Sequence, residues 1–331
     1  MASAPHLRSL GELAGEVDVA WLWGRDLDRL RQAAVPAGTR LTTRLTTRLS
    51  DVLGDPGVQA VLILTPPHLH RDLAVQAARA GKHVLVEKPL EVDLPRAIEL
   101  VEACEQAGVA LAVMLQHRLR PGAVALADLL KRGALGEVLN AGAFVRWWRP
   151  QSYYDVPGRG TMARDGGGVL MTQAIHTLDL LFSLIGVPER VTGAARTTTV
   201  HRMECEDTAA ALLHYPGGMT AVLQATTAAF PGFAERIEID GTLGSATLES
   251  GVLTARLASG DTVTAGGSVG TGGGADPMAF DHGPHRMVIE DFARAVRSGT
   301  APSVSGRSAL AVQRVIDAVM ASSRSGAAAH L

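Results

Sequence analysis

The first third of the chain alternates short apolar runs with amphipathic segments. Continuous apolar runs predict strands at 17–23, 60–64, 83–86 and 109–113. The intervening segments carry apolar residues at helical spacing and predict helices at 26–34, 70–80 and 93–107. Because these strands have no polar face, we expect them to be buried on both sides, in a parallel sheet covered by helices.

The pattern changes after about residue 120. A helix is predicted at 121–131, a strand-like aromatic segment at 137–149, and a glycine triplet followed by a helix within 165–185. Turn signals then separate strand patterns from 187 to about 265, which favours antiparallel pairing. Two helices close the chain, at 285–298 and 306–323. We therefore predict an α/β protein of two domains, 1–120 and 121–331, whose last helices are candidates for packing on the first domain.

Composition and charge exclude several classes of protein. Hydrophobic residues make up 47% of the 331 residues and charged residues 19%, which is enough apolar material for a large core. The formal net charge of −2 argues against a nucleic-acid-binding or membrane-surface protein. No run approaches the roughly 18 apolar residues that span a bilayer, and no secretory pattern is visible, so a cytoplasmic location is expected. Two cysteines form neither a disulfide framework nor a zinc site by themselves, and we predict no metal site.

Two loops that follow predicted strands carry residues suited to ligand binding. The strand at 60–64 runs into Thr65-Pro66-Pro67-His68-Leu69-His70, and the strand at 83–86 runs into Glu87-Lys88-Pro89. Ligands of open parallel sheets bind beyond the carboxyl ends of the strands, where both segments are expected. Lys88 is one of three lysines among 31 basic residues, and an amine, unlike a guanidinium, is able to lose its proton. The alternatives are a plain strand-to-helix turn with exposed histidines, and a solvated Glu-Lys pair.

The helix after the glycine triplet carries a second candidate cluster. Thr172 and His176 are four residues apart and Asp179 lies three further on, so the three side chains are predicted to share one helix face. Asp179 would then orient His176, whose side-chain type is suited to proton transfer near neutral pH. The glycines at 166–168 would let the backbone approach a ligand closely. The alternative is a core histidine satisfied by a helix neighbour.

Together these segments resemble the glucose–fructose oxidoreductase/inositol dehydrogenase (Gfo/Idh/MocA) family. The shared motifs are TPPHLH at 65–70, EKP at 87–89 and GGGxLxxxxIH at 166–176. Residues 289–310 also look like the closing helices of that family. The resemblance extends from near residue 1 to about residue 325.

The resemblance implies an N-terminal Rossmann domain and a C-terminal α/β domain with a large, mostly antiparallel sheet. It also implies hydride transfer between NAD(P) and a hydroxyl-bearing carbon of a sugar, cyclic polyol or cis-dihydrodiol. Lys88 matches the family's EKP lysine and His176 its helix histidine. His176 would take the hydroxyl proton, while Lys88 orients the hydroxyl and stabilises the developing negative charge. The implied cofactor-side residues are Arg25, Thr65, Pro66, His68, Glu87 and Lys88, and the substrate-side residues are Tyr153, Tyr154, Arg159, Thr172 and His176.

Two departures from the family pattern concern catalysis and cofactor binding. The family usually has an aspartate four residues before the helix histidine, where this chain has Thr172, which carries no charge. A Rossmann domain also begins with a central strand and a G-x-G-x-x-G turn, and this sequence has neither. The expected sheet therefore lacks its first strand. Two explanations stay open: a native chain that starts upstream of Met1, or a shortened, non-catalytic member with crippled cofactor binding that serves a binding or assembly role.

The end of the second expected strand bears on the cofactor. The family's ribose-binding acid would stand at Gly24, and the next residue is Arg25, which is able to pair with a 2′-phosphate. We therefore expect NADP or NAD, with NADP favoured; the alternative is an exposed arginine that opens a helix. Strands at 209–215 and 220–225 have apolar residues on both faces, which predicts a homodimer or dimer of dimers through that sheet. The only other partner expected is a small polyol-type substrate.

Overall fold

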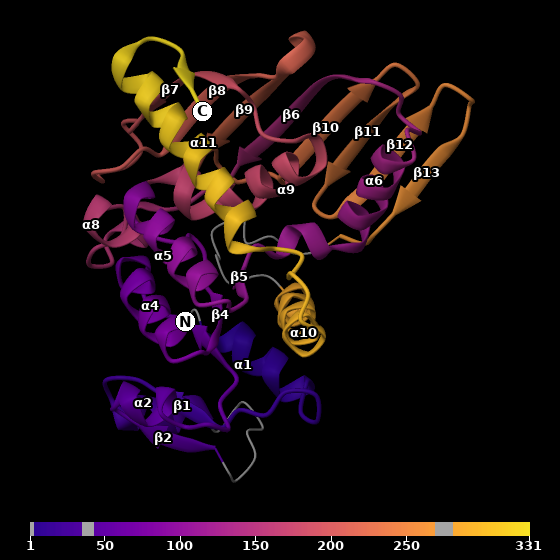
Figure 1. The fold of residues 1–331 in the computed structure, drawn as a ribbon. Helices are drawn as coiled ribbons and strands as arrows, with labels where there is room; N and C mark the ends of the chain where they lie inside the picture. Colours follow the sequence, from indigo (N-terminus) through magenta and orange to yellow (C-terminus); the bar gives the residue numbers. More distant parts are fainter. Residues whose placement is uncertain (1–2, 35–42, 269–280) are drawn as a thin grey trace. The chain divides into compact units, whose positions relative to one another are not determined.

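The computed structural model describes residues 3–34, 43–268 and 281–331, and the chain divides into two compact units (Figure 1). The first unit comprises Met1–Glu91, Pro95–Gln116 and Asp281–Arg307; the second comprises Val92–Leu94, His117–Phe280 and Ser308–Leu331. Residues 281–307 include one of the two closing helices named as candidates for packing on the first domain, and they belong to the first unit, whereas residues 92–94 belong to the second.

The named strands of the first unit pair with one another in parallel. They are β1 (Trp21–Trp23), β2 (Arg44–Thr46), β3 (Ala60–Ile63), β4 (His83–Val86) and β5 (Leu111–Val113). β1 pairs with β2, and β3, β4 and β5 pair in that order. Val84, Leu85 and Val86 of β4 are almost inaccessible to solvent, as the lack of a polar face predicted. The expected Rossmann-like arrangement is confirmed.

The parallel strands form two separate sheets, in which β1 and β3 are end strands. A doubly wound sheet carries its first strand between these two positions. The carbonyl of Ile63 accepts a hydrogen bond from the N–H of Glu87, so the N–H and C=O of Leu62 point away from β4, toward the open edge of β3. Among the described residues, no strand pairs with that edge. This agrees with the fold expected from the sequence, a Rossmann-like sheet without its first strand.

The first unit contains six named helices. They are α1 (Ser3–Glu12), α2 (Leu27–Ala34), α3 (Leu49–Leu53), α4 (His70–Arg79), α5 (Leu94–Gln106) and α10 (Gly283–Ser298). Of these helices, α2, α3, α4 and α10 contact the strands of the unit. α4 buries the small residues Ala74, Ala77 and Ala78, which lets the helix lie close to β3 and β4. α1 lies against α10, where the Ser9 hydroxyl contacts the carbonyl oxygens of Pro5 at 2.8 Å and His282 at 3.2 Å. Segments from the two ends of the sequence therefore pack as neighbours.

The second unit contains a nine-stranded mixed sheet. Its strands are β6 (Val138–Arg146), β7 (Arg190–Arg196), β8 (Thr208–His214), β9 (Thr220–Thr226), β10 (Arg236–Gly241), β11 (Gly244–Glu249), β12 (Val252–Leu257), β13 (Thr262–Ala265) and β14 (Ala329–His330). The strand order is β13-β12-β11-β10-β6-β9-β8-β7-β14. The pair β6–β9 is parallel and the other pairs are antiparallel. The predicted large, mostly antiparallel sheet is confirmed.

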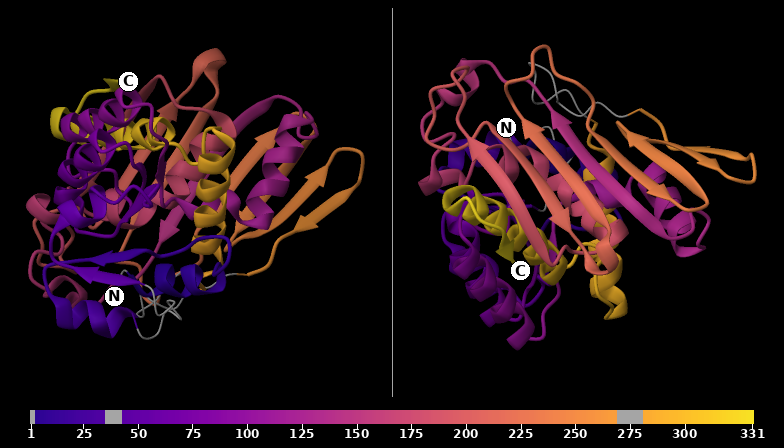
Figure 2. Two further views of the ribbon diagram at one scale, coloured as in Figure 1. Left: turned by 60° about the horizontal axis from the view of Figure 1, so that its bottom comes forward. Right: turned by 90° about the horizontal axis from the view of Figure 1, so that it is seen from above.

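The long helices of the second unit lie on one face of this sheet (Figures 1 and 2). They are α6 (Pro121–Lys131), α9 (Ile175–Ile185) and α11 (Gly306–Ser325); α7 (Gln151–Tyr154) and α8 (Met162–Asp165) are single turns. Alternate strand residues are buried toward the helices, as for Leu213 and Leu223. The intervening residues Leu212 and Val222 lie on the opposite face, with 38% and 44% of their surface exposed.

Residues Met162–Ile185 are long and apolar enough to cross a membrane by length and composition, with a mean hydropathy of 1.4. Polar residues such as Thr172 and Asp179 interrupt this stretch, so the sequence shows no unbroken apolar run here. In the structure, 72% of the apolar window is buried. We therefore describe it as the core helix of the second unit.

The sheet face that carries Leu212 and Val222 leads to a prediction about assembly. Leu212 and Val222 are neighbours on β8 and β9, and we expect them to be buried between two copies of the chain. Solution scattering at micromolar concentration should give the mass of a dimer or tetramer, and Leu212→Glu should shift it toward the monomer. Leu139→Glu is the control. This exposed leucine is the second residue of β6, and it lies an odd number of residues from Gly142, which pairs with Val222 of the other face. A monomeric mass for the unmodified protein would contradict the prediction.

Candidate active site

The loops after β3 and β4 leave the sheet at the same edge. β3 and β4 are parallel and Ile63 pairs with Val86, so the residues that follow both strands lie at the carboxyl ends. The first loop continues into the short turn η2 (Pro67–Leu69) and then α4. The second contains Glu87 and Lys88. This is the edge at which the sequence predicted ligand binding.

His70 connects the two loops. Its ring is fully buried, with Nδ1 2.9 Å from the carbonyl oxygen of Pro89 and Nε2 2.8 Å from that of Thr65. Burial lowers the pKa of His70, although the two backbone contacts act in the opposite direction. The alternative of an exposed helix-start residue is therefore wrong for His70, whereas His68 is exposed. The structural role of His70 has no local signal in the sequence, because its partners lie five and nineteen residues away.

The other residues expected near the cofactor occupy both sheets of the first unit. Pro66 and His68 are exposed, and Thr65 is half-buried. The Thr65 hydroxyl oxygen is buried and has no hydrogen-bond partner in the structure. Arg25 is exposed just beyond the end of β1. These positions leave polar groups unsatisfied or exposed where a ligand is expected.

Glu87 is held by two hydrogen bonds. His6 Nε2 lies 2.6 Å from Glu87 Oε1, and the N–H of Lys88 donates to Oε2 at 2.9 Å. Burial acts to raise the pKa of Glu87, but the hydrogen bond from His6 and the charges of His6 and Lys88 outweigh it and place the pKa at about 2. The carboxylate is therefore ionised at neutral pH and fixes the backbone at Lys88, whose side chain is half-buried.

His176 lies at the start of α9 in the second unit, after the π-helical turn η4 (Leu170–Ala174). Its ring stacks on that of His117, with centroids 5.0 Å apart and planes at 27°. His117 is buried and His176 is half-buried. His117 was not singled out from the sequence, since its 59-residue separation from His176 leaves no local pattern.

The glycine triplet has a structural reason. A Cβ at Gly168 would lie 1.7 Å from the carbonyl oxygen of Glu206, and one at Gly166, where φ is +73°, would lie 2.4 Å from Val92 backbone atoms. The Glu206 carboxylate also accepts the N–H of Gly168 at 2.9 Å and that of Leu170 at 3.1 Å. The close approach predicted from these glycines is therefore to the protein's own backbone, and the interpretation as a ligand approach is not supported.

The predicted partnership between Asp179 and His176 is wrong. Asp179 is fully buried, and its carboxylate accepts two hydrogen bonds from the guanidinium of Arg118, one of them from Nε at 2.6 Å. Burial raises the pKa of Asp179 to about 6, although Arg118 acts in the opposite direction. The hydroxyl of Thr172 lies 2.6 Å from the carbonyl oxygen of Gly168, to which it donates within its own helix. The π-turn between Thr172 and His176 also changes the regular i, i+4 spacing on which the shared face was based.

The expected substrate-side residues fall into two environments. The guanidinium of Arg159 lies 4.1 Å from the ring centroid of Tyr153, and both side chains are half-buried. Tyr154 is buried, and its hydroxyl is 2.8 Å from the Thr227 hydroxyl. Burial raises the pKa of Tyr154. The structure therefore makes Tyr154 a core residue, which corrects its assignment as a substrate contact, and leaves Tyr153 and Arg159 as candidates.

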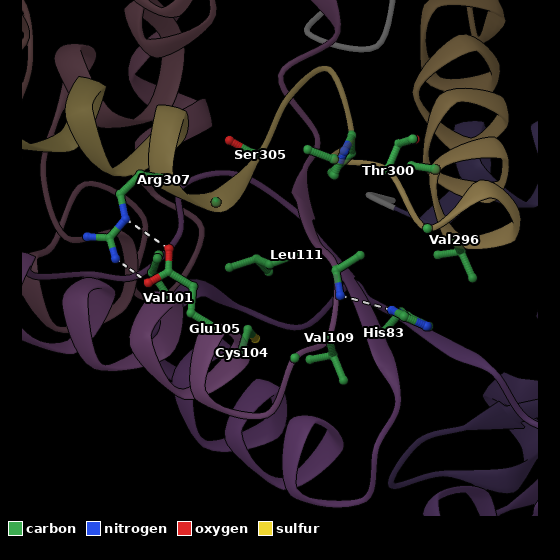
Figure 3. A pocket seen from close by; sticks show the side chains of 17 residues that line it. His83, Val101, Cys104, Glu105, Val109, Leu111, Val296, Thr300, Ser305 and Arg307 are labelled. Atoms are coloured by element: carbon green, nitrogen blue, oxygen red, sulfur yellow. Dashed lines mark hydrogen bonds and ion pairs between the residues drawn. The ribbon is translucent and has the colours of Figure 1, made fainter.

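A separate cavity of about 330 Å³ lies at the opposite edge of the sheet (Figure 3). It is near the amino end of β4, where His83 Nδ1 accepts the N–H of Ala110 at 2.9 Å. Val101 and Leu111 contribute apolar walls, and the ion pair between Arg307 and Glu105 lines one side. Because ligands of parallel sheets bind at the carboxyl ends of strands, we do not assign this cavity to the active site.

Comparison with known proteins identifies the two parts of the chain. Residues 1–115 match the family profile described as "Oxidoreductase family, NAD-binding Rossmann fold". Residues 123–247 match the profile "GFO/IDH/MocA C-terminal domain". The two matches correspond to the parallel strands and to the large mixed sheet.

Relatives are similar over most of the chain. "Uncharacterized oxidoreductase ORF334" of Rhizobium meliloti is 28% identical over 94% of this chain and 90% of its own length. "D-xylose 1-dehydrogenase (NADP(+)) 2" of Haloferax volcanii is 29% identical over 85% of this chain and 82% of its own length. The crystal structure of the WlbA dehydrogenase from Bordetella pertussis, in complex with NADH and UDP-GlcNAcA, has a TM-score of 0.83 at 27% identity and covers 100% of this chain and 96% of that one. The chain therefore belongs to the Gfo/Idh/MocA family of NAD-binding oxidoreductases.

Proposed function

We propose that this enzyme transfers a hydride between NAD(P) and a hydroxyl-bearing carbon of a sugar, cyclic polyol or cis-dihydrodiol. The observation that carries the proposal is the edge formed by Thr65 and Glu87-Lys88, at the carboxyl ends of β3 and β4, in a member of this family. Relatives named as D-xylose 1-dehydrogenase and as a dehydrogenase in complex with a nucleotide sugar support the substrate class.

The proposed roles of Lys88 and His176 follow from acid–base chemistry. Oxidation of an alcohol requires loss of a proton from the hydroxyl together with loss of hydride from its carbon. His176, half-buried on its stack with His117, accepts the hydroxyl proton. Lys88 donates a hydrogen bond to the same oxygen and stabilises its developing negative charge. Glu87 positions Lys88 through the backbone hydrogen bond.

The residues at this edge fit a nicotinamide cofactor. The buried hydroxyl of Thr65 lacks a hydrogen-bond partner. Pro66 and His68, in the same loop, are exposed to solvent. These residues and Lys88 would hold the nicotinamide end, and Arg25 the ribose end. Bound NAD(P) supplies the hydride acceptor or donor. Because the sequence contains no G-x-G-x-x-G turn, we assign no residue to the pyrophosphate.

Arg25 leads to a prediction about cofactor choice. A guanidinium beside a 2′-phosphate forms charge-assisted hydrogen bonds that contribute about 1.5–3 kcal/mol, so Arg25→Ala is expected to weaken NADPH binding roughly 10- to 100-fold. NADH affinity should be almost unchanged, as measured by fluorescence titration with both cofactors. Arg29→Ala is the matched control, because Arg29 is an exposed arginine on the adjacent helix α2. Equal effects on both cofactors would contradict the role of Arg25.

The proposed activity is tested by a substrate screen. Sugars, inositols and cis-dihydrodiols are incubated with NAD and with NADP, and the absorbance of the reduced nicotinamide is followed. We expect turnover with at least one member of the panel, and loss of that turnover in Lys88→Ala. Saturable NAD(P)H binding without turnover of any member would instead favour the non-catalytic alternative.

A further inference from the structure

Three side chains of types that bind metal ions lie close together in the first unit. Only one of them, Glu87, belongs to a motif identified in the sequence. His6 comes from α1, Glu87 follows β4, and His285 lies in the first turn of α10. One ligand atom from each residue lies within 4.8 Å of those of the other two. His6 is fully buried, and 5% of the surface of His285 is exposed to solvent. The cluster is therefore preformed, and its imidazoles are shielded from water.

The donor set is suited to a specific group of metal ions. Two imidazole nitrogens and one carboxylate oxygen are the protein ligands of many Zn²⁺ sites that keep a fourth position open. Borderline-soft nitrogen donors favour Zn²⁺ and neighbouring transition metals over Mg²⁺ or Ca²⁺, which prefer oxygen ligands. The two imidazoles and the carboxylate therefore predict a transition-metal ion such as Zn²⁺ at this position.

The hydrogen bond between His6 and Glu87 accounts for only part of the cluster. It occupies Nε2 of His6, while Nδ1 of this fully buried ring has no hydrogen-bond partner in the structure. The ring of His285 stands edge-on to that of His6, with centroids 5.0 Å apart and planes at 90°.

Shifts of up to about 1.4 Å separate this arrangement from a coordination site. With metal–ligand bonds of about 2.1 Å and tetrahedral angles, the ligand atoms would stand about 3.4 Å apart. The pair from His6 and Glu87, now 2.6 Å apart, would therefore open by less than about 1 Å. The ion would replace the proton at Nε2 of His6. A neutral ring would keep that proton on Nδ1, whereas a charged ring would release one proton to solvent when the ion binds.

The surrounding contacts hold the ligands in place. The N–H of Lys88 donates to Glu87 Oε2, which orients the carboxylate as second-shell groups do in metal sites. Ser9 connects α1 to the carbonyl oxygen of His282, three residues before His285. We propose that His6, Glu87 and His285 bind one divalent transition-metal ion of the Zn²⁺ type, which joins α1, the loop after β4 and α10.

Cobalt provides a direct spectroscopic test. Protein freed of metal with a chelator is titrated with Co²⁺, whose visible d–d absorption is intense in four-coordinate sites. We expect saturation at one ion per chain, displacement by Zn²⁺, and a higher unfolding temperature with Zn²⁺, because the ion binds the native state. His285→Ala should weaken Co²⁺ binding at least about 100-fold, since loss of second-shell partners alone lowers metal affinity by 10- to 100-fold.

Two further variants make the test decisive. His285→Phe keeps an aromatic ring of similar size against His6 but offers no ligand atom, and it should lose Co²⁺ binding while retaining its circular dichroism spectrum. His282→Ala is the matched control, because this histidine lies on the same segment and pairs with Glu12 on the surface. Absence of saturable Co²⁺ binding by the unmodified protein would overturn the proposal. Loss of binding in His282→Ala but not in His285→Phe would also overturn it.

Discussion

Replacement of His176 with alanine is expected to lower kcat by about 10²- to 10⁴-fold, the range contributed by general acid–base groups. The variant loses the imidazole that accepts the hydroxyl proton, while the π-turn and α9 that carry it should remain folded. Lys88→Ala should cause a loss in the same range, because the developing negative charge loses its stabilising amine. Steady-state kinetics with the substrate found in the screen measure both effects.

Matched controls are available for both substitutions. Lys131→Ala removes another of the three lysines, in the last turn of α6, and His214→Ala removes a histidine from β8. Both should retain nearly full turnover. Wild-type turnover in His176→Ala would show that another group is the base. A large rise in KM with unchanged kcat for Lys88→Ala would show that this lysine binds substrate without assisting the reaction.

Replacement of Arg118 with leucine is expected to lower the free energy of unfolding by about 3–5 kcal/mol, because it leaves the carboxylate of Asp179 buried without its partner. The pKa of Asp179 is about 6 in the folded protein, raised from 3.8, so the fold disfavours the ionised form. Without Arg118 this pKa should rise further. The loss of stability should therefore grow as the pH increases above about 6, because below that pH the carboxyl is protonated in both folded proteins. Denaturant unfolding at several pH values measures it.

Two comparisons test this explanation. The double variant Arg118→Leu/Asp179→Leu removes the stranded carboxylate and should recover most of the lost stability. Arg132→Leu breaks the exposed pair with Asp128, in which both side chains are more than half exposed, and should change stability by less than about 1 kcal/mol. A loss in Arg118→Leu that does not depend on pH would contradict the role assigned to Asp179.

Periodicity along the chain was sufficient to predict most of the elements. β4 at His83–Val86 and α6 at Pro121–Lys131 have the predicted bounds, because a continuous apolar run and an amphipathic stretch are local signals. The parallel sheet followed because β4 and its neighbours lack a polar face. The return of α10 to the first unit was not fixed by these patterns, since an amphipathic helix does not specify the surface that its apolar face will contact.

The site was predicted less completely, because its side chains are partnered across long separations. Arg118 and Asp179 are 61 residues apart, and His6 and Glu87 are 81 residues apart. No local spacing reveals such pairs, so Asp179 was assigned to His176, its neighbour in sequence. The EKP and GGG motifs located Lys88 and His176 but could not indicate that Gly168 makes room for Glu206. The homodimer, the cytoplasmic location and the convergence of Lys88 and His176 on one substrate stay predictions.

Isotope transfer tests the central claim most directly. The substrate found in the screen is prepared with deuterium on its carbinol carbon and incubated with oxidised nicotinamide, and the reduced cofactor is examined by mass spectrometry. If hydride passes from that carbon to the nicotinamide, the cofactor gains one deuterium, and the gain falls with the loss of turnover in Lys88→Ala and His176→Ala. Reduced cofactor that carries no deuterium would contradict the account.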